Sequence, residues 1–134
     1  MSHMSEYKTQ ISNTDPRILQ AAFEAICQEE PFTGIGILPQ TQLRWSDFAI
    51  DPTGQGRTSG YGVMQISAKG PLKISFDTDG NYNPHVALMN QFRSRLEQTY
   101  QALAIIQAAA QMGYNVQSIS GQPGQTLDLT LARA

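Results

Sequence analysis

The segment from Asp77 to Asn83 carries the oxygen-rich side chains that could bind a divalent cation. Its order, Asp-Thr-Asp-Gly-Asn-Tyr-Asn, places carboxylate and amide oxygens at alternate positions around Gly80, as in the first half of a calcium-binding loop. That loop requires a glutamate six residues after its glycine, and this chain has Val86 there. Because Asp-Gly between apolar runs is also a common turn, we expect a turn and no metal site.

A second segment, from Gly54 to Gly60, combines flexible glycines with a basic side chain. Gly54, Gly56 and Arg57 could hold a phosphate group. The glycine spacing matches neither the dinucleotide-binding fingerprint nor the P-loop, and no capped helix follows to point its N-terminus at an anion. We therefore expect a connecting loop, and we keep a small-ligand or phosphate-binding regulatory domain as the alternative function.

His85 and Cys27 could do acid–base or nucleophilic chemistry. His85 could act as a general base beside Asp77 or Asp79, but no nucleophile or polarising group stands at a recognisable spacing. Glutamates near Cys27 in the sequence would raise the pKa of its thiol, which makes it a weaker nucleophile. One cysteine and two histidines also fall short of a four-ligand zinc site. We predict no catalytic residue, no metal and no cofactor, and treat the chain as a non-enzyme.

Five aromatic residues between positions 45 and 82 could form a stacking platform for single-stranded nucleic acid. Such platforms need flanking basic residues, and here the few Lys and Arg are balanced by aspartates. We therefore predict that these aromatic side chains pack in the core and across strands. They are Trp45, Phe48, Tyr61, Phe76 and Tyr82.

The length and the charge of the chain exclude further classes of function. The chain has 134 residues, 40% hydrophobic and 15% charged, with nine Lys and Arg against eleven Asp and Glu. This length fits one domain, and scattered charges give no footprint for nucleic acid or an anionic membrane. There is no apolar run long enough for a spanning helix and no basic leader before an apolar segment. We expect a soluble protein of a reducing compartment, cytoplasmic or in the plastid stroma.

Local sequence patterns predict the first strand and the first helix. Tyr7–Ile11 alternates in the manner of a half-buried strand. A cap at residues 13–15 followed by Pro16 predicts a helix start, with Leu19, Ala22, Phe23 and Ile26 on one face. Glu29-Glu30-Pro31 should end this helix.

The central region, Phe32–Asn83, is rich in Gly and Pro and predicts an antiparallel meander. Its short alternating segments are Leu43–Trp45, Tyr61–Ile66 and Leu72–Phe76. Gly34–Leu38 fits either a strand or a loop.

A long helix is predicted at Pro84–Met112 from apolar residues spaced three and four apart. Its second half, Ala102–Met112, has no charged residue, so it is either buried or meets another chain. Two strands follow, Tyr114–Ile119 and Thr126–Leu131, joined by a turn at Gly121–Gly124.

Together these elements predict one α+β domain over residues 1–134. Its order is β-α-β-β-β-α-β-β, with an antiparallel sheet of about five to six strands and two helices on one face.

The N-terminus carries a family resemblance. Met1-Ser2-His3 followed by Lys8-Thr9-Gln10-Ile11 resembles the start of the hypothetical chloroplast open reading frame thirty-five family, small proteins of cyanobacteria, plastids and some other bacteria and phages. Tyr100 and Gly113-Tyr114 also stand at the family's spacing, although Ala102 replaces a second tyrosine that is common there. Ser2-His3-Met4 also fits the scar of a cleaved tag, with Met4 as the native start.

The resemblance implies this fold and a non-enzymatic role, and gene neighbourhoods in the family suggest an AAA-type ATPase as a partner. The uncharged helix segment independently suggests a protein partner or a second copy of the chain. We therefore predict a protein-binding, assembly or regulatory module that uses Tyr100, Leu103, Ile106 and Ala110, in a homodimer or a heterocomplex.

Overall fold

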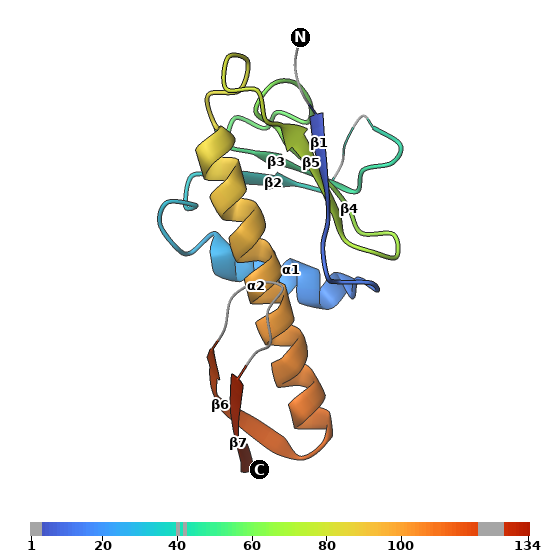
Figure 1. Cartoon of the computed structure of the whole chain (residues 1–134), viewed down its shortest axis with the longest axis vertical. Helices are drawn as coiled ribbons and strands as arrows, with labels where there is room; N and C mark the ends of the chain where they lie inside the picture. Colours follow the sequence, from blue (N-terminus) through green and yellow to red (C-terminus); the bar gives the residue numbers. More distant parts are fainter. Residues whose placement is uncertain (1–3, 40, 42, 121–127) are drawn as a thin grey trace.

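The computed structural model describes residues 4–39, 41, 43–120 and 128–134. Within them the chain forms two helices and two antiparallel sheets, which confirms the predicted α+β class (Figure 1). The elements are β1 (Met4–Lys8), α1 (Pro16–Ile26), β2 (Gly36–Leu38), β3 (Phe48–Asp51), β4 (Met64–Ser67), β5 (Lys73–Asp77), α2 (Val86–Gln111), β6 (Tyr114–Ser120) and β7 (Asp128–Arg133).

The strands divide into two separate sheets. Five of them form a sheet of order β1-β5-β4-β3-β2, and β6 pairs only with β7 in a two-stranded sheet. The segment that fitted either a strand or a loop supplies β2, at the edge of the larger sheet. The predicted turn at residues 121–124, the start of the last predicted strand and the first three residues lie outside the described residues.

One predicted strand is wrong. Leu43–Trp45 lies in a turn, and the strand of this region is β3 at Phe48–Asp51. Ala49, Ile50 and Asp51 are all buried, so both faces of this strand are covered. A strand buried on both faces has no alternating pattern.

Other boundaries shift by a few residues. β1 ends at Lys8, earlier than predicted, because the backbone N–H and the side chain of Thr9 both donate to the carbonyl of Leu72. α1 begins at Pro16 as predicted but ends at Ile26. α2 begins at Val86, after Asn83 has accepted a hydrogen bond from the backbone N–H of His85.

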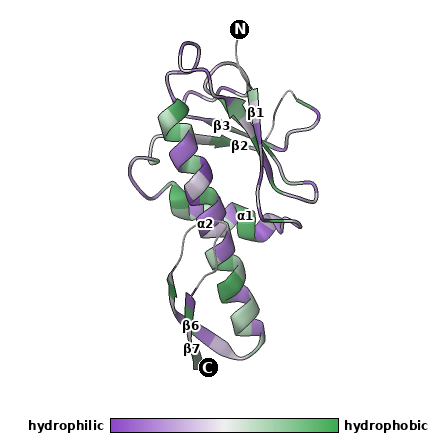
Figure 2. Cartoon of the chain, in the orientation of Figure 1, coloured by the Kyte–Doolittle hydropathy of each residue, from purple (hydrophilic) through white to green (hydrophobic). Residues whose placement is uncertain are grey.

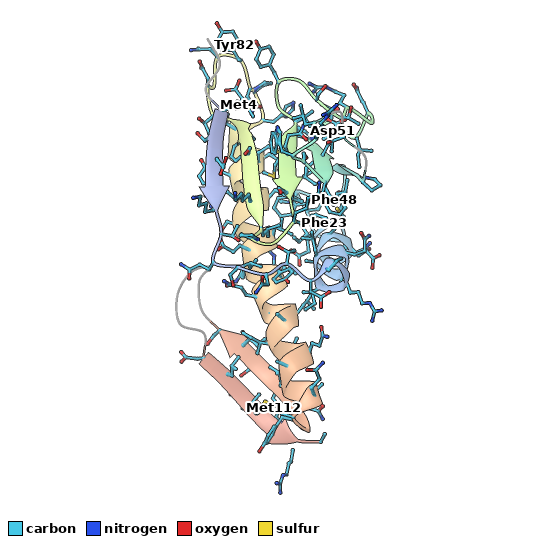
Figure 3. All side chains as sticks on the ribbon, turned by 90° about the vertical axis from the view of Figure 1, so that its right-hand side faces the viewer. Met4, Phe23, Phe48, Asp51, Tyr82 and Met112 are labelled. Carbon is cyan, nitrogen blue, oxygen red and sulfur yellow. The ribbon has the colours of Figure 1, made fainter. Side chains whose placement is uncertain are left out.

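The core lies between the two helices and one face of the larger sheet. The predicted apolar face of α1 is confirmed, since Leu19, Ala22, Phe23 and Ile26 are all buried. Phe23 meets Phe48 of β3 edge to face, with 5.2 Å between ring centroids (Figure 3). The first half of α2 adds three fully buried side chains, Met89, Phe92 and Leu96.

Hydrogen bonds fix the connection between β1 and α1 onto the middle of α2. The Asp15 side chain caps α1 by accepting from the backbone N–H of Arg17 at 2.9 Å. The backbone N–H of Asp15 in turn donates to the hydroxyl of Tyr100 at 2.7 Å. One turn earlier on α2, Glu97 accepts from the backbone N–H of Gln10 at 2.9 Å.

The two helices are also joined near the end of α1. The guanidinium of Arg95 donates to both carboxylate oxygens of Glu29, at 2.9 and 2.7 Å. This hydrogen bonding, with the positive charge of Arg95, lowers the pKa of Glu29. Both side chains are partly exposed, so the pair orients the helices more than it stabilises the fold.

Beyond Ala104 the helix leaves this core. α2 has 26 residues and is therefore about 39 Å long. Its second half extends away from the larger sheet together with the β6–β7 hairpin (Figure 1), and apolar residues recur along it (Figure 2). We call residues 102–120 and 128–134 the arm, and the remaining described residues the body.

We predict that Tyr100→Phe lowers the free energy of unfolding by about 1 kcal/mol, because the partly buried N–H of Asp15 loses its acceptor. Tyr100→Ala should cost about 3 kcal/mol or more, since it also leaves a cavity. Urea unfolding followed by circular dichroism measures both changes. Equal midpoints for wild type and Tyr100→Phe would show that the hydrogen bond contributes nothing.

Candidate functional site, the arm formed by the long helix and the last two strands

The candidate cation loop is a turn held by its own backbone. Asp77 accepts from the backbone N–H of Asp79 at 2.8 Å, and Asp79 accepts from that of Asn81 at 2.9 Å. The side-chain amide of Asn83 donates to the carbonyl of Asp77 at 2.6 Å. Among the described residues, no group of three or more His, Cys, Asp or Glu could hold a metal ion. The segment therefore serves to lead β5 into α2.

The candidate phosphate loop is wrapped around a carboxylate of the protein itself. Asp51, fully buried at the end of β3 (Figure 3), accepts from the backbone N–H groups of Thr53, Gln55 and Arg57 at 2.9 to 3.0 Å. It also accepts from the Thr53 hydroxyl at 2.7 Å. The Arg57 guanidinium donates to the carbonyl of Tyr61. Three backbone N–H groups that could have bound a phosphate are thus directed at Asp51.

Gly54 has a structural reason to be glycine. Its φ is +70°, and a Cβ atom there would lie 2.5 Å from the carbonyl oxygen of Gly34. Both the positive φ and the close approach exclude a side chain. The glycine that suggested a ligand loop is therefore explained by the packing of the loop.

These hydrogen bonds determine the acidity of Asp51. Burial by itself would raise the pKa of the carboxyl group, but the hydrogen bonds from Arg57, Thr53 and Gln55 outweigh it. The pKa of Asp51 therefore lies below its ordinary value. This carboxylate organises the loop, a role that we did not predict, although an aspartate two residues before Thr53 is a common signal for such a turn.

Cys27 and His85 lie in different parts of the body. Cys27 is half-buried in an apolar cleft between α1 and β2, beside Phe23 and Ile37. Burial raises the pKa of its thiol, where we had expected nearby carboxylates to be the cause. His85 is the N-cap residue of α2 and makes no capping hydrogen bond with its side chain.

The five aromatic residues of the central region separate into two groups. Phe48 packs against the core and Phe76 is fully buried, as predicted. Trp45, Tyr61 and Tyr82 are exposed, so the packing prediction is wrong for them. Their positions in loops explain the difference, because a loop aromatic has no sheet face to pack on. Tyr61 and Tyr82 stack on each other with ring centroids 5.4 Å apart.

The four residues predicted to contact a partner differ in exposure. Tyr100 is only 5% exposed and its hydroxyl is used within the chain. Leu103 is half-buried against the core. Ile106 is 44% exposed, and Ala110 is also exposed. The accessible part of the predicted surface thus begins at Ile106, nearly two helical turns after Tyr100.

A groove of about 550 Å³ lies where the arm joins the body. One wall is α2 and the other is the connection between β1 and α1, with a leucine of β7 at its end. The lining residues are Gln10, Ile11, Ser12, Asn13, Tyr100, Gln101, Ala104, Ile105 and Leu129. The groove is therefore continuous with the surface of the arm.

The hairpin covers only part of the helix. β6 packs on α2, whereas β7 packs mainly on β6. Val116 pairs with Leu131 and Ile119 pairs with Leu129 across the hairpin, so these four side chains share one face of the sheet. Val116 and Ile119 are half-buried, but Leu129 and Leu131 are 41% and 44% exposed.

The arm is also almost uncharged. No charged residue occurs from Gln98 to Leu127, and Asp128 and Arg133 follow as the arm's two charged side chains. The uncharged segment predicted from the helix pattern, Ala102–Met112, is therefore only part of a longer one. Its continuation through the following strands is the signal by which the whole arm could have been found.

Comparison with known proteins adds no assignment, since no family model, curated protein or solved structure matches this chain. Within the described residues, neither helix combines the length and the apolar character needed to cross a membrane.

We predict that Asp51→Asn lowers the free energy of unfolding at pH 7 by about 2 kcal/mol, because an amide cannot accept all four hydrogen bonds. The pKa of Asp51 is lower in the folded chain. Its stabilisation is therefore complete above the ordinary pKa of about 4 and is lost as the pH falls through the lower folded value.

Urea midpoints measured from pH 7 to pH 2.5 test this. The difference between wild type and Asp51→Asn should shrink at the acid end. Glu24→Gln, which changes an exposed carboxylate, is the control and should leave stability nearly unchanged. A constant difference over the whole pH range would contradict the assigned role of Asp51.

Proposed function

We propose that this chain is a non-enzymatic protein-binding and assembly module that acts through the arm. The observation that carries the proposal is the exposure of large apolar side chains on a nearly uncharged projection. Ile106, Met112, Leu129 and Leu131 are 44%, 74%, 41% and 44% exposed. Large apolar side chains that are exposed on a surface with few charges are typical of protein interaction sites.

The architecture of the arm supports the same function. A two-stranded sheet is at best marginally stable alone, and this one has a single helix on one face. Three elements cannot enclose a core of their own, so the apolar side chains of the arm gain most from a cover supplied by another chain. Ala108 and Ala110 are exposed, and their small side chains allow a partner backbone to approach this part of α2 closely.

The alternative, a phosphate-binding regulatory domain at Gly54–Gly60, has less support. Its N–H donors are directed at Asp51, and Arg57 is engaged by Tyr61. A bound phosphate would have to displace a buried carboxylate that has a lowered pKa and is therefore charged at neutral pH.

The family resemblance of the N-terminus suggests which partner to test first. In that family an AAA-type ATPase is a candidate, and the compartment would be the cytoplasm or the plastid stroma. The ATPase partner and the compartment are both parts of this proposal.

A charge placed on the arm should abolish the interaction. We predict that Ile106→Glu lowers recovery of bound protein from the source cells by more than about tenfold, as expected for a charge buried at an interface core. Ile106 is already partly exposed, so the variant should fold. Quantitative mass spectrometry of affinity-purified wild type and variant measures the change.

The matched control is Tyr61→Glu, which places the same charge at a similarly exposed apolar residue of the body. It should recover the same proteins as wild type. Equal losses in both variants, or no loss in Ile106→Glu, would remove the arm as the binding surface.

A further inference from the structure

The two edges of the hairpin are not equivalent. β6 contains a register shift between Val116 and Ser118, and such a bulge twists an edge and hinders further pairing. β6 also packs against α2. β7 is six residues long and regular, and its second edge pairs with no other described strand. β7 is therefore the edge at which another strand could be added.

The pairing pattern shows which backbone groups of β7 point outward. The backbone N–H of Ala134 donates to the carbonyl of Gly113 at 2.9 Å, so Ala134 faces β6. In an antiparallel ladder the direction alternates along the strand. The N–H and C=O groups of Leu129, Leu131 and Arg133 therefore point away from β6.

We propose that β7 pairs antiparallel with β7 of a second copy of this chain, which joins two hairpins into one four-stranded sheet. This inference rests on the proposed function of the arm and identifies its partner. In the register with Leu131 on the two-fold axis, Leu131 meets the same residue of the second copy. Leu129 then meets Arg133, and all three outward-facing residues of each strand are hydrogen-bonded.

The charges of the arm favour this arrangement. Asp128 and Arg133 stand at opposite ends of β7. In this register Asp128 lies opposite Ala134 of the second copy, and its side chain points to the other face from Arg133. The opposite charges therefore attract only as neighbouring strand ends, whereas parallel pairing would place like charges directly side by side. The rest of the arm is uncharged, so two copies approach each other without electrostatic repulsion.

The apolar surface is covered by the same arrangement. A two-fold axis perpendicular to the sheet keeps both α2 helices on one face, and the exposed Leu129 and Leu131 of both copies then meet between the helices.

Sedimentation equilibrium from micromolar to millimolar concentration tests the pairing. We predict a dimer for wild type. Leu131→Pro removes an outward N–H, a position where a strand accepts proline, and Leu131→Ala isolates the loss of the side chain. The dissociation constant of Leu131→Pro should exceed that of Leu131→Ala by at least about tenfold. Equal constants, or a monomeric wild type, would overturn the proposal.

Charge variants at exposed positions test the direction of the paired strands without a risk to folding. Asp128→Arg or Arg133→Asp alone should weaken the dimer by about twofold at low salt, because each places like charges at neighbouring strand ends. The double variant, D128R with R133D, should restore it. A double variant weaker than either single one would overturn the antiparallel direction.

The outcomes separate this inference from the proposed function. A monomeric wild type whose captured partners still depend on Ile106 overturns the strand pairing and leaves the arm as a binding surface. A monomeric wild type whose captured partners do not depend on Ile106 overturns both.

Discussion

The length of α2 is the constraint on which the rest of the structure depends. The helix is about 39 Å long, whereas strands of three to five residues span about 10 to 17 Å. The larger sheet and α1 can therefore cover only the first half of the helix. The second half needs a separate cover, and the chain supplies part of it by turning back at Gly113 into β6 and β7.

The body holds α2 firmly at the point where it leaves the core. Glu97 and Tyr100 accept hydrogen bonds from the connection between β1 and α1, and Leu96 is fully buried one turn before. The arm is thus a continuation of a fixed helix. A helix that is anchored along half its length presents the other half in a defined orientation, which lowers the entropic cost of binding a partner.

Local signals in the sequence predicted both helices and the class of the fold, because capping residues and apolar spacing act within a few residues. They failed where the burial or the hydrogen bonds of a residue depend on the folded structure around it. β3 was missed because both of its faces are buried, which removes the alternating pattern. Tyr100 was expected on a binding surface, but spacing gives the face of a helix and not the neighbour that covers it. The hydrogen bonds of Asp51 likewise depend on the closed shape of its loop.

Amide hydrogen exchange of β7 at low and high protein concentration tests the central claim most directly, that another chain covers the edge of the arm. If a second copy pairs with β7, the backbone amides of Leu129, Leu131 and Arg133 should exchange fast at low protein concentration and become protected as the concentration rises. Thr130 and Ala132, which face β6, should change less. Outward-facing amides that stay unprotected at every concentration would contradict the pairing of β7 with another chain.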